Sequence, residues 1–166
     1  TTGHYAGAYV PSIRGWMDKH PDIVKKTAAS LTIEHLGCRE WLDDATAKFV
    51  ATGKDDMCYA VAALEPMGKL MLEALQGSGD RRVGVGKPTP KGRYLGEGGN
   101  LSRAGIPAIG YFAGPTYLNM AAPDGCISKL SKPHMHAQIA AFAKLLHKID
   151  VVAAADLKGP AARSQG

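Results

Sequence analysis

The stretch Gly96–Asn119 decides the fold, and it reads Gly-Glu-Gly-Gly-Asn-Leu-Ser-Arg-Ala-Gly-Ile-Pro-Ala-Ile-Gly-Tyr-Phe-Ala-Gly-Pro-Thr-Tyr-Leu-Asn. Its centre, Ile106–Phe112, is a short apolar run bounded by glycine and proline, which predicts a buried strand of an α/β sheet. A glycine-rich loop carrying Glu97 precedes this run, and a turn leading to Tyr117 and Asn119 follows it. Ligands of parallel sheets bind beyond the carboxyl ends of the strands, so the following segment is placed to reach a site. Plain turn chemistry is the alternative explanation of the glycines.

The composition indicates one ordinary soluble domain. The 166 residues are 45% hydrophobic and 21% charged, which is enough for a sizeable core. No apolar run approaches the ~20 residues of a membrane span, and no signal-peptide pattern is found, so we expect a cytoplasmic protein without membrane contact. The net charge of +5 comes from scattered basic residues, which argues against nucleic-acid binding. Cys38, Cys58 and Cys126 have no paired spacing, which fits a reduced protein better than a disulfide or zinc framework.

Strand and helix patterns alternate along the chain before the central run. Helices are predicted over Pro11–His20, Asp22–Lys26 and Pro66–Gln76, and strands over Ala28–Gly37 and Arg82–Gly86. This alternation predicts an α/β domain with three layers, a mostly parallel sheet and helices on both faces.

Three other segments have weaker patterns. Arg39–Asp56 is polar and irregular, which predicts a loop with weak helix or hairpin content. Met57–Leu64 fits one or two helical turns. Residues 151–166 are rich in Ala, Gly and Pro and are predicted to form a flexible tail after a domain that covers residues 1–150.

The clearest helix of the sequence is His134–Asp150, which follows a suitable N-cap at Ser131. Apolar residues recur in it at spacings of four, three, four and three, so one face is expected to pack on the sheet. The residues of this face are Met135, Ile139, Phe142, Leu146 and Ile149. Three histidines lie largely off the stripe and are expected to face solvent, namely His134, His136 and His147.

Arg103–Phe112, with the sequence Arg-Ala-Gly-Ile-Pro-Ala-Ile-Gly-Tyr-Phe, resembles part of the co-catalytic zinc aminopeptidase family. That family includes bacterial leucyl aminopeptidases, aminopeptidases S and Y, and glutaminyl cyclases. Its carboxyl-terminal half typically reads Ser-Asp-His-x-x-Phe-x-x-Ala-Gly-Ile-Pro, then a strand, a His-Thr loop, Asp-Lys-Leu and a long helix. Ser128–Leu130 and the helix from Ser131 follow here in that order. Thr32–Gly37 is similar to the family's Asn-Leu-Asp-Met-Ile-Gly strand, and Gly3–Gly7 to its Glu-Glu-x-Gly stretch.

The resemblance implies a hydrolase of amide or peptide bonds with its site at the carboxyl edge of the sheet. The family's Glu-Glu, a general base and a zinc ligand, corresponds to His4 and Tyr5, and its strand-end Asp ligand corresponds to Glu34. The Asp of Ser-Asp-His corresponds to Glu97. His4 is therefore expected to act as general base, Glu34 as a metal ligand, and Glu97 to hold the substrate amine or the attacking water. The other residues expected to contact substrate are Tyr5, Tyr117 and Asn119.

Departures from the family pattern imply an incomplete metal site. Gly98 replaces the His of Ser-Asp-His, and the late zinc ligand falls near residues 117–122, where only Asn119 is a polar candidate. The first zinc His and the bridging Asp would lie before Thr1. Zinc catalysis needs about three protein ligands. Zinc is therefore a possible cofactor, but this chain alone is not expected to build a complete di-zinc site.

The incomplete site leaves three hypotheses open. The chain is a subunit or fragment of a hydrolase, with another polypeptide supplying the amino-terminal half, or it is a non-catalytic pseudo-peptidase module of an assembly. In either case we expect an apolar edge covered by a partner chain or by a homo-oligomer. The third hypothesis is an N-terminal nucleophile hydrolase using Thr1, although such enzymes have stacked antiparallel sheets. If the chain is a hydrolase subunit, the carboxyl groups of Glu34 and Glu97 should lie within about 10 Å of each other, and His4 should border the same cavity.

Overall fold

A four-stranded mixed sheet forms the centre of the computed structural model, which describes residues 11–80, 82–86, 98–114 and 127–159. Its strands, in spatial order, are β1 (Ser30–Glu34), β6 (Ala108–Ala113), β4 (Cys58–Ala62) and β5 (Val83–Gly86). β1 and β6 are parallel, and so are β4 and β5, whereas β4 runs antiparallel to β6. The sheet is therefore mostly parallel, with one antiparallel pairing at its middle.

β6 is the central strand that the apolar run predicts. All its residues except Phe112 are buried, because it has a strand on each side and a helical layer on each face. Ile109 and Tyr111 point to one face of the sheet and join the main core cluster, whereas Ala108 joins a smaller cluster.

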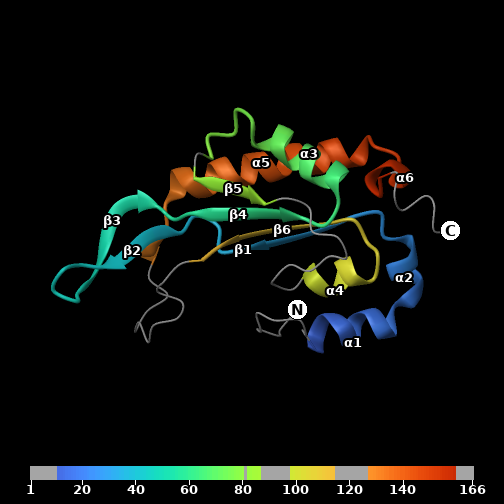
Figure 1. Cartoon of the computed structure of the whole chain (residues 1–166), viewed down its shortest axis with the longest axis horizontal. Coiled ribbons are helices and arrows are strands. Elements are labelled where there is room, and N and C mark those ends of the chain that lie inside the picture. The colour runs from blue at the N-terminus through green and yellow to red at the C-terminus, as the bar shows by residue number, and fades with distance from the viewer. Residues whose placement is uncertain (1–10, 81, 87–97, 115–126, 160–166) are drawn as a thin grey trace.

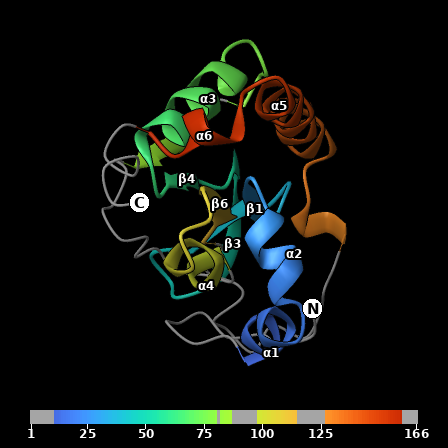
Figure 2. The same ribbon diagram turned by 90° about the vertical axis from the view of Figure 1, so that its right-hand side faces the viewer.

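Helices cover both faces of the sheet, which confirms the predicted α/β class (Figures 1 and 2). One face carries α3 (Glu65–Leu75), α5 (Lys132–Asp150) and the short α6 (Ala154–Leu157). The other side carries α4 (Gly98–Arg103), which contacts β6 and β1, together with α1 (Pro11–Lys19) and α2 (Pro21–Lys26). None of the helices in the described ranges has the length and apolar character that crossing a lipid bilayer requires.

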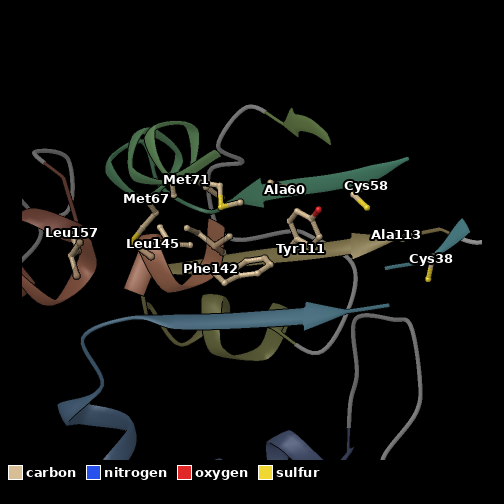
Figure 3. Packing of buried hydrophobic residues seen from close by; sticks show 13 residues of the cluster. Cys38, Cys58, Ala60, Met67, Met71, Tyr111, Ala113, Phe142, Leu145 and Leu157 are labelled. Carbon is tan, nitrogen blue, oxygen red and sulfur yellow. The ribbon is translucent and has the colours of Figure 1, made fainter. Parts of the chain in front are cut away.

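The main core lies between the sheet and the α3–α5 layer (Figure 3). Met67 and Met71 of α3 are almost fully buried, as is Leu145 of α5. The rings of Tyr111 and Phe142 meet edge-to-face with their centroids 4.9 Å apart. This geometry is one of the preferred arrangements of aromatic pairs.

The prediction of helical turns over Met57–Leu64 is wrong, because β4 occupies this segment. Cys58, Ala60 and Ala62 are buried on the face of the main core, and Tyr59 and Val61 point to the other face. This period of two is that of a strand. Alanines favour a helix in isolation, but pairing with β5 and β6 on both sides overrides that local preference.

The segment Arg39–Asp56 is more regular than predicted and forms an antiparallel hairpin of β2 (Arg39–Asp43) and β3 (Phe49–Asp55). The Asp44 carboxylate accepts hydrogen bonds from the backbone of Lys48 and Thr46 and so stabilises the turn. These hydrogen bonds hold the pKa of Asp44 below its ordinary value.

α5 turns a different face to the sheet than its apolar stripe predicts. The buried residues are His134, Gln138, Ala141, Phe142 and Leu145. Ile139 and Leu146 were expected in the core but are 51% and 56% exposed, and His134, expected in solvent, is 5% exposed. The expectation holds for Phe142 and for the exposed His136 and His147.

Two further segments differ from expectation. Residues 98–103 form α4 rather than a glycine-rich loop, and Gly98 and Gly99 are buried in it. Part of the segment expected as a flexible tail forms α6, whose Leu157 is 1% exposed within the main core. The packed part of the chain therefore extends past residue 150.

Candidate functional site

Glu34 lies at the carboxyl edge that β1 and β6 share. The two strands are parallel neighbours in a register that sets Glu34 opposite Phe112, so both strands end together. Directly opposite residues share a face of the sheet, so Glu34 and Phe112 point to the α4 side. The Phe112 ring packs against Tyr59 with the centroids 5.9 Å apart, and Tyr59 is 47% exposed. A half-buried carboxylate therefore lies on the same face and at the same edge as an accessible aromatic pair.

Glu34 is the one predicted site residue inside the described ranges. The others, His4, Tyr5, Glu97, Tyr117 and Asn119, lie outside them, as does Thr1. The expected approach of Glu34 and Glu97, and the position of His4, therefore stay predictions. The described residues form a four-stranded mixed sheet and a two-stranded hairpin, which differ from the stacked antiparallel sheets that the Thr1 hypothesis requires.

A buried polar network lies on the opposite, α5 face of the same edge. The Tyr111 hydroxyl donates to Asp80 Oδ2 at 2.5 Å and accepts from Gln138 Nε2 at 2.8 Å. Gln138 Oε1 accepts from the backbone N–H of Gly37 at 2.7 Å, at the point where the chain leaves β1. Gln138 therefore connects α5, β6 and the end of β1 through hydrogen bonds made in the core.

His134 adds an imidazole to this network. Its Nε2 lies 2.9 Å from Gln138 Nε2 and 3.8 Å from Cys58 Sγ. Its Nδ1 faces two carboxylates, with Asp55 Oδ2 at 3.7 Å and Asp80 Oδ1 at 3.9 Å. The thiol, the imidazole and the carboxylates come from four separate segments, so spacing along the sequence gives no signal for them.

The Cys58 thiol is unsuited to nucleophilic catalysis although His134 is close to it. Burial raises the pKa of Cys58 to about 11, and the nearby carboxylates of Asp80 and Asp56 act in the same direction. The side chain has no exposed surface. The attacking species in cysteine catalysis is the thiolate, which this environment disfavours. Burial and the hydrogen bond to Asp80 likewise raise the pKa of Tyr111 well above its ordinary value. The network is therefore a structural core feature.

The described residues do not by themselves fit a zinc site. Among them, no three His, Cys, Asp or Glu side chains converge so that they could hold a metal ion. Glu34 could give one oxygen ligand, and zinc would need further ligands from elsewhere.

A shallow hollow opens between the α3–β5 connection and the first turns of α5. Its lining residues are Ser78, Gly79, Lys132, Pro133, His136 and Ala137. Glu34, the predicted site residue that the structure describes, is not among these lining residues.

Comparisons of the chain with protein-family models, with curated proteins and with solved structures found no match. The relationship to zinc aminopeptidases therefore rests on the residues that resemble the family motifs, and it stays a prediction.

Proposed function

We propose that the chain is a subunit or fragment of a hydrolase that cleaves an amide or peptide bond at the carboxyl edge of β1 and β6. One observation carries this proposal, namely the parallel pairing of these two strands in the register Glu34 opposite Phe112. The pairing places Glu34 at the edge from which the segment containing Tyr117 and Asn119 continues along the chain. In parallel sheets this is the edge where ligands bind.

The roles proposed for the side chains follow from their chemistry. The His4 imidazole accepts the proton of the attacking water, because an imidazole is the side chain most often used as a general base near neutral pH. The oxygen of this water adds to the substrate carbonyl, the C–N bond breaks, and the proton passes to the departing amine. Glu97 holds the substrate amine or orients the water, and Glu34 acts as an ion ligand or an orienting carboxylate. Tyr5, Tyr117 and Asn119 contact the substrate.

Completion of this site by another polypeptide is part of the proposal. Glu34 alone cannot bind zinc with the three protein ligands that catalytic sites use, and the described residues lack such a group. We therefore propose zinc only for the assembly in which another polypeptide adds ligands.

Native purification with the subunit composition resolved tests this proposal. We expect a second polypeptide in the preparation and release of nitroaniline from aminoacyl-p-nitroanilides by the assembly. Separation of the chains should abolish this release, and recombination should restore it. A preparation with one polypeptide that releases no nitroaniline, with or without added Zn²⁺, would contradict the hydrolase proposal.

A non-catalytic binding module is the second candidate, and a specific observation favours it. Ile33, Ile139 and Leu146 are 41%, 51% and 56% exposed although all three are large and apolar. Ile139 and Leu146 lie about two turns apart on one flank of α5, and contiguous exposed apolar surface marks interaction sites. A stable assembly that lacks any hydrolytic turnover would favour the module over the enzyme.

A further inference from the structure

β1 is an outer strand with one free edge in the described part of the chain. It pairs with β6, and the Ser30 N–H donates to the Pro107 carbonyl at 2.8 Å. Backbone groups of alternate residues in such a strand point to opposite sides. Ser30, Thr32 and Glu34 therefore direct theirs toward β6, whereas Leu31 and Ile33 direct theirs outward. Two N–H groups and two carbonyls are thus arranged to pair with another strand.

An apolar flank accompanies this edge on the α5 face. Ile33 stands opposite Tyr111 and so shares the face of the sheet on which Tyr111 packs against α5. α5 and α3 lie side by side on the same face of the sheet, with α5 nearer to β1 and α3 nearer to β4 (Figure 2). Lys144 and Lys148 of α5 reach toward α3, where they contact the Gln76 carbonyl and the Glu73 carboxylate.

Ile139 and Leu146 lie on the opposite flank of α5, away from α3, and both are more than half exposed. The exposed side chains of Ile33, Ile139 and Leu146, with the outward backbone groups of Leu31 and Ile33, are here named the β1–α5 surface.

We propose that a second copy of this chain covers the β1–α5 surface, with the two β1 strands antiparallel about a twofold axis at Thr32. In this register Leu31 of one copy forms a hydrogen-bonded pair with Ile33 of the other, and Thr32 stands opposite Thr32. Apolar side chains then meet on the α5 face, and polar ones meet on the α4 face. The two sheets join into one of eight strands, and the exposed flanks of the two α5 helices face each other across the axis.

The charges near the two ends of β1 favour a second copy as the partner and the antiparallel direction of pairing. The exposed Lys25 and Lys26 end α2, just before β1, and Glu34 ends β1. Antiparallel pairing directs the basic end of each copy toward the acidic end of the other, so the two pairs of ends attract each other across the axis. Parallel pairing would place the two Glu34 carboxylates together, which is repulsive. The inference goes beyond the proposed hydrolysis and does not depend on it.

Sedimentation velocity over a series of protein concentrations tests the inference. We expect a reversible change from 17.5 kDa to twice that mass. Ile139→Lys and Ile33→Lys should raise the midpoint concentration at least about tenfold, because each places a charge in the interface. Leu72→Lys is the matched control, since Leu72 is a 50% exposed apolar residue of α3, and it should leave the midpoint unchanged. Unchanged far-UV circular dichroism confirms that each variant is folded.

Disulfide trapping tests the register separately. Thr32→Cys places two thiols in a non-hydrogen-bonded antiparallel pair, whose Cα separation of about 4.5 Å lies within the disulfide range. Mild oxidation should link this variant into dimers and should leave Ser30→Cys unlinked, because residue 30 stands opposite residue 34. A chain that stays monomeric at every concentration would overturn the inference. So would a dimer that is insensitive to Ile139→Lys, equal linking of both cysteine variants, or a different polypeptide on this edge in native material.

Discussion

Tyr111 shows how one residue can serve the apolar core and a polar network together. Its ring packs edge-to-face on Phe142, and its hydroxyl donates to Asp80 while accepting from Gln138. The sequence identifies Tyr111 as an apolar member of a central strand. It gives no sign of the polar partners, because they lie 31 and 27 positions away along the chain.

Loss of this hydroxyl should destabilise the fold. Tyr111→Phe removes the hydrogen bond from the hydroxyl to Asp80 Oδ2 and the one that the hydroxyl accepts from Gln138 Nε2, both inside the core, which should cost about 1–3 kcal/mol of unfolding free energy. Urea unfolding measures this difference. The matched control is Tyr59→Phe, which removes the hydroxyl of a tyrosine that is 47% exposed and should change stability by less than about 0.5 kcal/mol. Equal effects of the two variants would argue against the network.

The Cys58 thiol should make stability fall in alkaline solution. Its pKa rises from an ordinary 9.0 to about 11 in the folded chain, chiefly through burial. Between these pH values the folded state retains a proton that the unfolded state has lost, so unfolding becomes easier as pH increases. The contribution is complete below pH 9, and its loss is at most about 3 kcal/mol. Unfolding free energy measured from pH 8 to pH 11 should therefore fall more steeply in the parent chain than in Cys58→Ala. Identical slopes would contradict the raised pKa.

At the scale of the element, α5 shows where periodicity misleads. Its apolar stripe predicts the helix and its length correctly, but the helix buries His134 and Gln138 in place of Ile139 and Leu146. The hydrogen bonds of Gln138 to Gly37 and Tyr111 fix this rotation. No pattern of apolar residues can anticipate such a choice, because the partners belong to other elements.

Two substitutions on α5 distinguish the observed face from the predicted one. Phe142→Ala should cost about 3–5 kcal/mol, because the side chain is 5% exposed and its removal leaves a cavity. Leu146→Ala should cost less than about 1 kcal/mol in dilute protein, since Leu146 is 56% exposed. Chemical denaturation of both variants measures these values. A Leu146→Ala loss as large as that of Phe142→Ala would restore the face predicted from the sequence.

α6 should contribute to stability although its segment resembles a flexible tail. Leu157 is 1% exposed in the main core, so Leu157→Ala should lower the unfolding free energy by about 2–4 kcal/mol. Val151→Ala, at a 71% exposed position of the same segment, should have almost no effect on the thermal midpoint. If the two variants melt at the same temperature, α6 does not pack in solution.

At the scale of the whole molecule, the sequence predicts the architecture better than the connections. Gly, Pro and apolar signals indicate β6 as a buried strand, and the helices on both faces follow from the alternation of elements. The assignment of β4 fails because the alanines of Met57–Leu64 favour a helix locally, whereas long-range pairing between β5 and β6 makes the segment a strand.

Only one residue of the candidate site that the sequence predicts, Glu34, can be compared with the structure. The resemblance leads to Glu34 at a strand end, and β1 does end there beside β6. The remaining predicted residues lie outside the described ranges, so the site as a whole remains a proposal. The buried network of Asp80, Tyr111, Gln138 and His134 escapes prediction, because its members share no sequence motif.

The most direct test of the proposed hydrolase compares the turnover rate of the parent assembly with that of the same assembly carrying Glu34→Gln. Glutamine keeps the size of the side chain and removes its charge. With saturating aminoacyl-p-nitroanilide, kcat should fall by about a hundredfold or more, because a carboxylate that binds an ion or orients the water has been lost. Glu65→Gln, at an exposed position of α3 paired with Lys69, is the matched control and should keep the parent rate. Equal rates for the parent, Glu34→Gln and Glu65→Gln would contradict a hydrolytic site at the carboxyl edge of β1 and β6.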